Sequence, residues 1–204
     1  MENISVNISA EKNADTPSPR KVRAQLDRDG WVEGAVAVLS EEGMNGLRIE
    51  VLAKNFGVTK GSFYWHFKDR KDLLDAILEH WREGRMRDIE KQTNAEAGQE
   101  KEQLLSVIEV YSASRNRKGM AIELAVRDWA QRDPAVAKIV EGVDLYRLEC
   151  TRRLFVACGL DEAEARSRSV LLYAYVFGQS LMFSEHFDAD PASLKRRIAA
   201  QIVG

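Results

Sequence analysis

Residues 47–67 read LRIEVLAKNFGVTKGSFYWHF. Apolar residues in the first part recur at spacings of three and four, which is typical of one face of a short helix. Gly57 can adopt the positive φ of a tight turn, and Thr59 is placed to cap a following helix by accepting a hydrogen bond from a first-turn amide. Phe63 and Phe67 fall on one face of that second helix, four residues apart. The stretch therefore predicts two short helices joined by a tight turn, a helix-turn-helix.

The second helix of this motif has polar groups on the face opposite its phenylalanines. Lysine, hydroxyl, phenol and imidazole groups contact phosphates and base edges in a DNA major groove, and a glycine lets the backbone come close. An aromatic cluster in a helical protein is usually core, but the preceding Gly-Val-Thr-Lys turn favours DNA contact for Tyr64 and His66. The residues expected on the exposed side are Lys60, Gly61, Ser62, Tyr64 and His66.

Outside the motif, spacings of three and four recur along most of the chain, and no stretch alternates with period two. Pro134 and Pro191 each follow an Asp and precede periodic apolar residues, so both are expected in the first turn of a helix. The sequence predicts an all-α protein. Its helices are expected at 22–42, 48–55, 59–66, 69–93, 100–115, 119–131, 134–158, 161–187 and 191–203.

Charge is unevenly distributed along the 204 residues, whose formal net charge is −2. Residues 20–71 contain ten Lys or Arg against seven Asp or Glu, whereas acids exceed bases on both sides of this segment. The basic excess therefore coincides with the helix-turn-helix, where a polyanionic partner would bind.

The two cysteines, Cys150 and Cys158, fall in one predicted helix, about 12 Å apart along its axis. That exceeds the roughly 7 Å between alpha carbons that a disulfide tolerates, so no bridge is expected between them. With no signal segment recognised, we expect a cytoplasmic location. The longest apolar run, residues 170–178, is about half of a bilayer span, so no membrane partner is expected.

Catalytic signatures are missing from the sequence. It contains no Gly-x-Ser-x-Gly, no His-Glu-x-x-His and no Walker-type loop, and Ser18-x-x-Lys21 lies in a polar N-terminal stretch that offers no pocket. His80 and His186 have no partner at metal-ligand spacing. We therefore expect no enzyme activity, no metal and no cofactor.

Two further features have more ordinary interpretations. The basic clusters at 115–118 and 195–197 are more often solvated helix ends than phosphate-binding patches. A helix-turn-helix can also serve protein contacts in a helical adaptor. Salt-sensitive retention on nonspecific DNA would distinguish a DNA-binding protein from an adaptor.

A family resemblance follows from residues 57–74, which read GVTKGSFYWHFKDRKDLL. This run closely resembles the DNA-binding signature of the TetR family of one-component regulators: a Gly-Val turn, a small-residue step, then Tyr-x-His-Phe and a Leu. The resemblance extends over about a third of the chain, and the remainder agrees in length, helicity and its Asp-Pro-led long helix. It implies a homodimer on a palindromic double-stranded DNA operator, released by a small-molecule effector, with repression as the family default and activation as the alternative.

The resemblance also implies roles for individual residues. One departure is Arg70, since many relatives have Lys one residue further on, where this chain has Lys71; only a phosphate contact depends on it. Residues expected at or near DNA are Thr59, Lys60, Gly61, Ser62, Tyr64, Trp65 and His66, with Arg48 and Lys68 on flanking phosphates.

The expected domain organisation has three parts. Residues 1–19 are polar with two prolines and predict a disordered arm. Residues 20–68 form the helix-turn-helix DNA-binding domain, and residues 69–204 form a helical ligand-sensing and dimerisation domain. Within it, the helix at 161–187 is apolar around much of its circumference, so we expect a two-fold homodimer formed mainly by the last two helices.

A mostly apolar pocket for a small apolar or aromatic effector is expected inside this larger domain. Tyr and Trp combine broad apolar faces with a polar tip, as small-molecule cavities require. Each such residue also fits an ordinary core position. The candidates are Trp81, Met86, Tyr111, Met120, Trp129, Tyr146 and Phe155.

Overall fold

The computed structural model describes residues 26–112, 117–182 and 187–204. Within these ranges every regular element is a helix, which confirms the predicted all-α class. The predicted arm lies outside them. The elements are α1 (Arg28–Glu42), the 3₁₀ turn η1 (Gly43–Asn45), α2 (Ile49–Asn55), α3 (Lys60–Tyr64), α4 (Arg70–Thr93), α5 (Glu100–Ser112), α6 (Arg117–Ala130), α7 (Pro134–Ala157), α8 (Glu162–Leu181) and α9 (Pro191–Val203).

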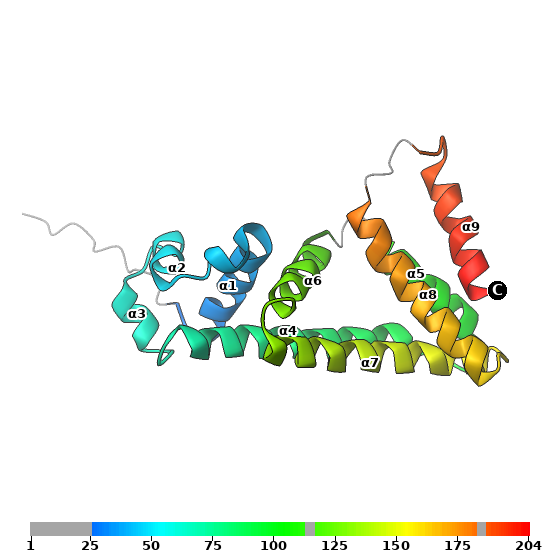
Figure 1. The fold of residues 1–204 in the computed structure, drawn as a ribbon, viewed down its shortest axis with the longest axis horizontal. Coiled ribbons are helices and arrows are strands. Elements are labelled where there is room, and N and C mark those ends of the chain that lie inside the picture. The colour runs from blue at the N-terminus through cyan, green and yellow to red at the C-terminus, as the bar shows by residue number, and fades with distance from the viewer. Residues whose placement is uncertain (1–25, 113–116, 183–186) are drawn as a thin grey trace, which may run out of the picture.

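Two long helices, α4 and α7, pack side by side, offset along their axes, and together extend along most of the long axis of the molecule (Figure 1). Each has 24 residues, which corresponds to about 36 Å. The short helices α1 to α3 lie at one end of this pair, and α5, α8 and α9 lie at the other (Figure 1). Helix α6 packs on both α1 and α7, so it connects the two ends.

Aspartates begin most of the helices. The side chain of Asp133 accepts hydrogen bonds from the amides of Ala135 and Val136, and Pro134 follows it in the first turn. Asp190 caps α9 in the same way ahead of Pro191. Because these carboxylates satisfy amides that have no partner inside the helix, each Asp fixes where its helix starts. The positions predicted for the two prolines are confirmed.

The helix boundaries differ most from the prediction at the start of α1 and the end of α8. Helix α1 begins at Arg28 rather than at residue 22, because Asp27 is extended and its carboxylate accepts a hydrogen bond from the Gly30 amide at 2.8 Å. Helix α8 ends at Leu181 rather than at 187, since Met182 has an extended backbone. Apolar periodicity was too coarse to locate these two ends.

The hydrophobic core forms two clusters. One joins α1 to α4 with α6 and the first part of α7, and places Trp31, Trp81 and Trp129 together. The other joins α5, α8 and α9 with the end of α7, around Phe155 and Leu172. Packing therefore continues from the helix-turn-helix into α6 and α7, across the boundary expected after residue 68. None of the described helices is long and apolar enough to cross a membrane.

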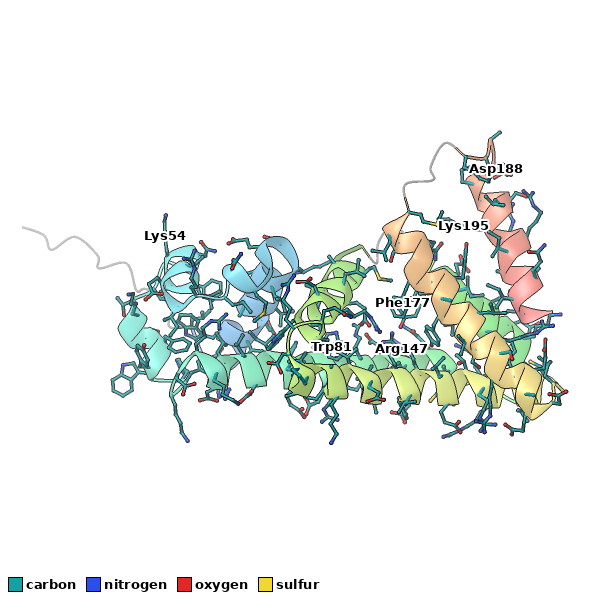
Figure 2. All side chains as sticks on the ribbon, viewed as in Figure 1. Lys54, Trp81, Arg147, Phe177, Asp188 and Lys195 are labelled. Carbon is teal, nitrogen blue, oxygen red and sulfur yellow. The ribbon has the colours of Figure 1, made fainter. Side chains whose placement is uncertain are left out.

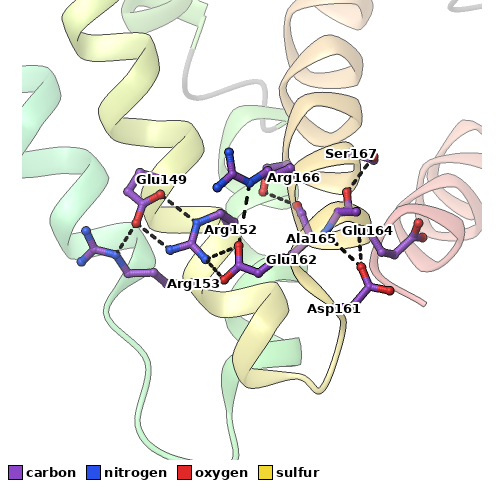
Figure 3. Close-up of polar contacts among 11 residues, drawn as sticks. Glu149, Arg152, Arg153, Asp161, Glu162, Glu164, Ala165, Arg166 and Ser167 are labelled. Atoms are coloured by element: carbon purple, nitrogen blue, oxygen red, sulfur yellow. Dashed lines mark hydrogen bonds and ion pairs between the residues drawn. The ribbon is translucent and has the colours of Figure 1, made fainter.

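Ion pairs join α7 to α8 beyond the apolar contacts (Figure 3). Arg152 donates to Glu149 on its own helix and to Glu162 on α8, each at 2.7 Å. Arg153 also donates to Glu149, at 3.0 Å. Hydrogen bonds from Arg152 and Arg153 lower the pKa of Glu149 to about 2. Because all of these groups reach solvent, the cluster adds modestly to stability.

Candidate nucleic-acid interface

The turn between α2 and α3 has the geometry predicted from the sequence. Gly57 has a φ of 66°, in the left-handed region that favours glycine. Its amide donates to the Lys54 carbonyl at 3.2 Å, and the Val58 amide donates to the Ala53 carbonyl at 3.0 Å. Thr59 is extended, and its hydroxyl accepts a hydrogen bond from the Ser62 amide at 3.2 Å. These contacts fix the direction in which α3 leaves α2.

Aromatic packing holds α3 against the rest of the domain. Phe63 is completely buried, stacks on Phe67 at 5.3 Å between ring centroids, and meets Trp31 of α1 edge-on at 5.4 Å. Phe56 also meets Trp31 edge-on, at 5.2 Å between ring centroids. Since α3 has only five residues, these rings rather than its own hydrogen bonds stabilise it.

The outer side of α3 carries the residues expected to reach DNA. Trp65 is 87% exposed and Tyr64 is 59% exposed, so the end of α3 presents a large aromatic surface to solvent. The two expected phosphate contacts, Arg48 and Lys68, are also exposed. Of the remaining candidates, Thr59, Lys60 and Gly61 are exposed, and Ser62 and His66 are half-buried.

An acidic residue lies beside the expected DNA-facing lysine. Lys60 donates to Glu50 of α2 at 2.7 Å, and both side chains are exposed. The hydrogen bond from Lys60 is the main reason that the pKa of Glu50 is lowered. Sequence reasoning missed Glu50, because ten residues and a turn separate it from Lys60. A contact from Lys60 to a phosphate therefore requires that this ion pair open.

Arg70 has a structural position that the sequence analysis did not assign. Its guanidinium donates to the carbonyls of Leu47 at 2.9 Å and Met44 at 3.3 Å, in the segment before α2. Nearby, Asp72 accepts from the Lys68 amide at 3.0 Å and from Arg28 at 3.2 Å. The start of α4 is thereby bonded to the segments on both sides of the helix-turn-helix, so a displacement of α4 would move α2 and α3.

The seven candidate effector contacts do not gather around one cavity. Trp81 and Trp129 belong to the core cluster nearer α1, and Met86 and Tyr146 pack against it. Tyr111, Met120 and Phe155 belong to the other cluster. A groove of about 630 Å³ between α4 and α7 includes Tyr146 alone of the seven.

A buried polar centre lies between the two clusters, where α6, α7 and α8 meet. Arg147 of α7 is 1% exposed and Glu123 of α6 is 2% exposed; they form an ion pair at 3.2 Å. Arg127 bridges Glu123 at 2.8 Å and Asp144 at 2.6 Å. Figure 2 labels Arg147 and Phe177 in the angle between α6 and α8.

The sequence contains a faint signal for this centre. Glu123 and Arg127 are four residues apart on α6, and Asp144 and Arg147 are three apart on α7, which are the spacings of ion pairs on a helix surface. Such pairs are usually solvated. Only the packing of α6 on α7 shows that these two pairs face each other inside the protein.

Comparison with known proteins points to one family. The family model described as "Bacterial regulatory proteins, tetR family" matches residues 32–77, which span the helix-turn-helix and the start of α4. The tetracycline repressor protein class C of Escherichia coli is 40% identical over 55 residues, which are 27% of this chain and 25% of that protein. The HTH-type transcriptional regulator AcrR of Shigella flexneri is 39% identical over 59 residues, 29% of this chain and 27% of that protein. The chain therefore matches about a quarter of the length of these curated relatives.

The whole fold also has solved counterparts. A transcriptional regulator from Rhodococcus sp. RHA1 superposes with a TM-score of 0.67 at 18% identity, over 86% of this chain and 93% of that one. At this identity the likeness concerns the fold. The family description and the names of these relatives are those of regulators and not of enzymes, in agreement with the expectation from the sequence.

Proposed function

Because this chain belongs to the TetR family of transcriptional regulators, we propose that it represses transcription as a homodimer bound to a palindromic operator and is released by a small-molecule effector. The observation that supports this most strongly is the outward side of α3. Exposed Tyr64 and Trp65 stand next to a buried Phe63 and a capped tight turn, so the helix is held rigidly with aromatic and polar groups facing outward.

In this proposal α3 enters the major groove and contacts base edges. Tyr64 and His66 then help to discriminate sequence, whereas Arg48 and Lys68 neutralise phosphates and set the position of the domain on the duplex. Gly61 has no side chain to keep the backbone from the DNA. The other groups proposed within reach of DNA are Thr59, Lys60, Ser62 and Trp65.

The proposed dimer uses the outer face of α8 together with α9. Apolar side chains on that face are exposed in the single chain, which is unusual for a face that remains in water. A Cβ built on Gly178 would meet no atom within 4 Å, so a second helix has room to approach there. A two-fold interface of this kind matches the two half-sites of a palindrome. The exposed apolar residues on and just after α8 are Val170, Leu171, Ala174, Leu181 and Met182.

We propose that the effector binds inside the helical body formed by α4 to α8 and acts on DNA binding through α6 and α4. Both helices share a core cluster with α1, which contains Trp129 of α6, Trp81 of α4 and Trp31 of α1. An effector that moves α6 would therefore also shift α1. A hundredfold loss of operator affinity requires that the effector favour the released geometry by about 2.7 kcal/mol. The residues proposed to contact the effector are the aromatic and sulfur-containing set that includes Met86, Tyr111, Met120, Tyr146 and Phe155.

The test of DNA binding compares two exposed side chains. Tyr64 is 59% exposed and Leu145 of α7 is 61% exposed, so alanine at either position should leave the core intact. In fluorescence anisotropy with a duplex, Tyr64→Ala should weaken binding and Leu145→Ala should not. Equal affinity of both variants and the native chain would remove α3 from the interface, and salt-independent binding would argue against a phosphate-contacting protein.

A further inference from the structure

Arg147 presents an unused binding edge inside the protein. Its Nη1 contacts Glu123 at 3.2 Å and Asp144 at 3.5 Å. Its Nε and Nη2 are buried and have no hydrogen-bond partner among the described residues. The N–H groups of Nε and Nη2 point the same way and form the edge of a guanidinium that binds a carboxylate through two parallel hydrogen bonds.

A third unpaired atom among the described residues belongs to the same ion pair. Oε1 of Glu123 accepts from Arg147 and from Arg127, whereas its Oε2 is buried without a partner in the described part of the chain. Buried polar atoms are rarely left unsatisfied in folded proteins, and those that are often belong to ligand or water sites. Three such atoms on two contacting side chains indicate a site with both a donor edge and an acceptor.

Aromatic rings lie near the Arg147 guanidinium. The Arg147 guanidinium lies 5.4 Å from the centroid of Tyr173 and 5.2 Å from that of Phe177. Tyr111 meets Tyr173 edge-on at 6.3 Å. Phe177 is half-buried and also lies 4.3 Å from the Arg127 guanidinium, so it is the covering ring with most room to turn aside. A molecule that reaches Arg147 would place its remaining atoms among apolar surfaces.

We propose that Arg147 binds the carboxylate of the effector, a small acid with an apolar or aromatic body. This rests on the proposed function, since it assigns the chemistry of the molecule that the body senses. Glu123 and Asp144 balance the charges of Arg127 and Arg147, so a bound carboxylate adds one net negative charge to a buried site and a phosphate dianion would add two. The lower charge favours a carboxylate. The free Oε2 of Glu123 accepts from a hydroxyl or amino group on the same molecule.

The location of the site provides a route to the DNA-binding end. Glu123 and Arg127 lie on α6, and Val126 and Trp129 of the same helix pack in the cluster that contains Trp31 of α1. A carboxylate on Nε and Nη2 of Arg147 lies beside Glu123, which is bonded to Nη1 of the same guanidinium, and the two negative charges repel. The acid therefore weakens the ion pair between α6 and α7 and lets α6 shift against α1.

The test measures binding of small acids to the full chain without DNA. The probes are benzoate, 4-hydroxybenzoate, 3-phenylpropionate and hexanoate, each with its neutral amide, and phenyl phosphate, followed by thermal shift and calorimetry. We expect at least one acid to raise Tm and its amide to have no effect. Arg147→Lys keeps the positive charge but loses the pair of parallel N–H donors, so it should weaken acid binding at least ~10-fold. The control Arg152→Lys changes an arginine of the same helix that lies outside the site and should bind as the native chain does.

Glu123→Gln provides a second variant should Arg147→Lys fail to fold. It removes the negative charge that repels the bound carboxylate, so it should tighten acid binding by roughly fivefold and leave the amides inactive. Equal binding of acids and amides, tighter binding of phenyl phosphate than of benzoate, no binding of any acid, or acid binding unaffected by both variants would overturn the proposal. Because no DNA is present, these outcomes are independent of operator binding. Loss of the proposed function would appear instead as absent DNA binding in a chain that still binds acids.

Discussion

Two glycines four residues apart, Gly57 and Gly61, should respond in opposite ways to alanine. Gly57 has a positive φ and open space around a built Cβ, so Gly57→Ala incurs backbone strain without a clash. That strain is about 1–2 kcal/mol, offset by about 0.4–1 kcal/mol from a less flexible unfolded chain. We therefore expect a net loss of about 1 kcal/mol in the free energy of unfolding, or roughly 2–4 °C in Tm. Folded Gly57→Ala should bind DNA as the native chain does.

Gly61 lies inside α3, and a Cβ there would contact only the Thr59 hydroxyl, at an ordinary 3.6 Å. Gly61→Ala should therefore stabilise the protein by about 0.5–1 kcal/mol, since alanine favours helix. The added methyl faces the proposed DNA surface, so operator affinity should fall. Denaturant unfolding and fluorescence anisotropy measure the two effects separately. A neutral Gly57→Ala, or a Gly61→Ala variant that is destabilised by a similar amount, would refute this assignment of backbone roles.

Three further predictions follow from the ion pairs and the exposed apolar face. Glu50→Gln should steepen the dependence of DNA affinity on salt because it frees Lys60 for a phosphate. Lys60→Ala should flatten that dependence by about one phosphate contact. Identical salt slopes for the two variants and the native chain would exclude Lys60 from the interface. Leu171→Glu on the outer face of α8 should convert dimers to monomers in analytical ultracentrifugation, and an unchanged mass would place the interface elsewhere. Glu149 has a lowered pKa, so its contribution to stability is complete above its unfolded pKa near 4.5 and is lost as the pH falls toward 2. Glu149→Gln should abolish that part of the pH dependence of stability, which amounts to less than about 1 kcal/mol because the pair with Arg152 reaches solvent. An unaltered dependence of stability on acid pH would contradict the assignment.

Local rules were sufficient to predict the helix-turn-helix. The positive φ of Gly57, the cap by Thr59 and the stacking of Phe63 on Phe67 each depend on residues within a few positions of one another. Backbone sterics and side-chain capping act over that range and leave a recognisable pattern. The prolines that begin α7 and α9 were predictable for the same reason.

Contacts between distant residues were not predictable. Arg70 reaches the carbonyls of Leu47 and Met44, which are 23 and 26 residues away in sequence. Arg147 belongs to an amphipathic helix, where an arginine is usually solvated, yet it is buried because α6 and α8 close over it. Tertiary packing decides both cases, and a single sequence records no pairing between helices.

The position of the expected effector pocket was also not predictable from the sequence. Residue type singled out large aromatic and sulfur-containing side chains, and the structure divides them between two core clusters. Aromatic residues serve a core and a ligand cavity equally well, so composition cannot separate the two. Arg147 and Glu123 have buried atoms without a partner in the described part of the chain, which is a more specific signal and is visible only in three dimensions.

The central claim is that α3 of a two-fold dimer recognises DNA, and selection of bound sequences from a random duplex pool tests it most directly. The native chain should enrich a palindrome with half-sites about one helical turn, or 34–36 Å, apart, or a multiple of that distance. A folded Tyr64→Ala/His66→Ala double variant should lose this enrichment while keeping weak, salt-sensitive binding. Enrichment of the same palindrome by the double variant, or no enrichment by the native chain, would contradict the claim.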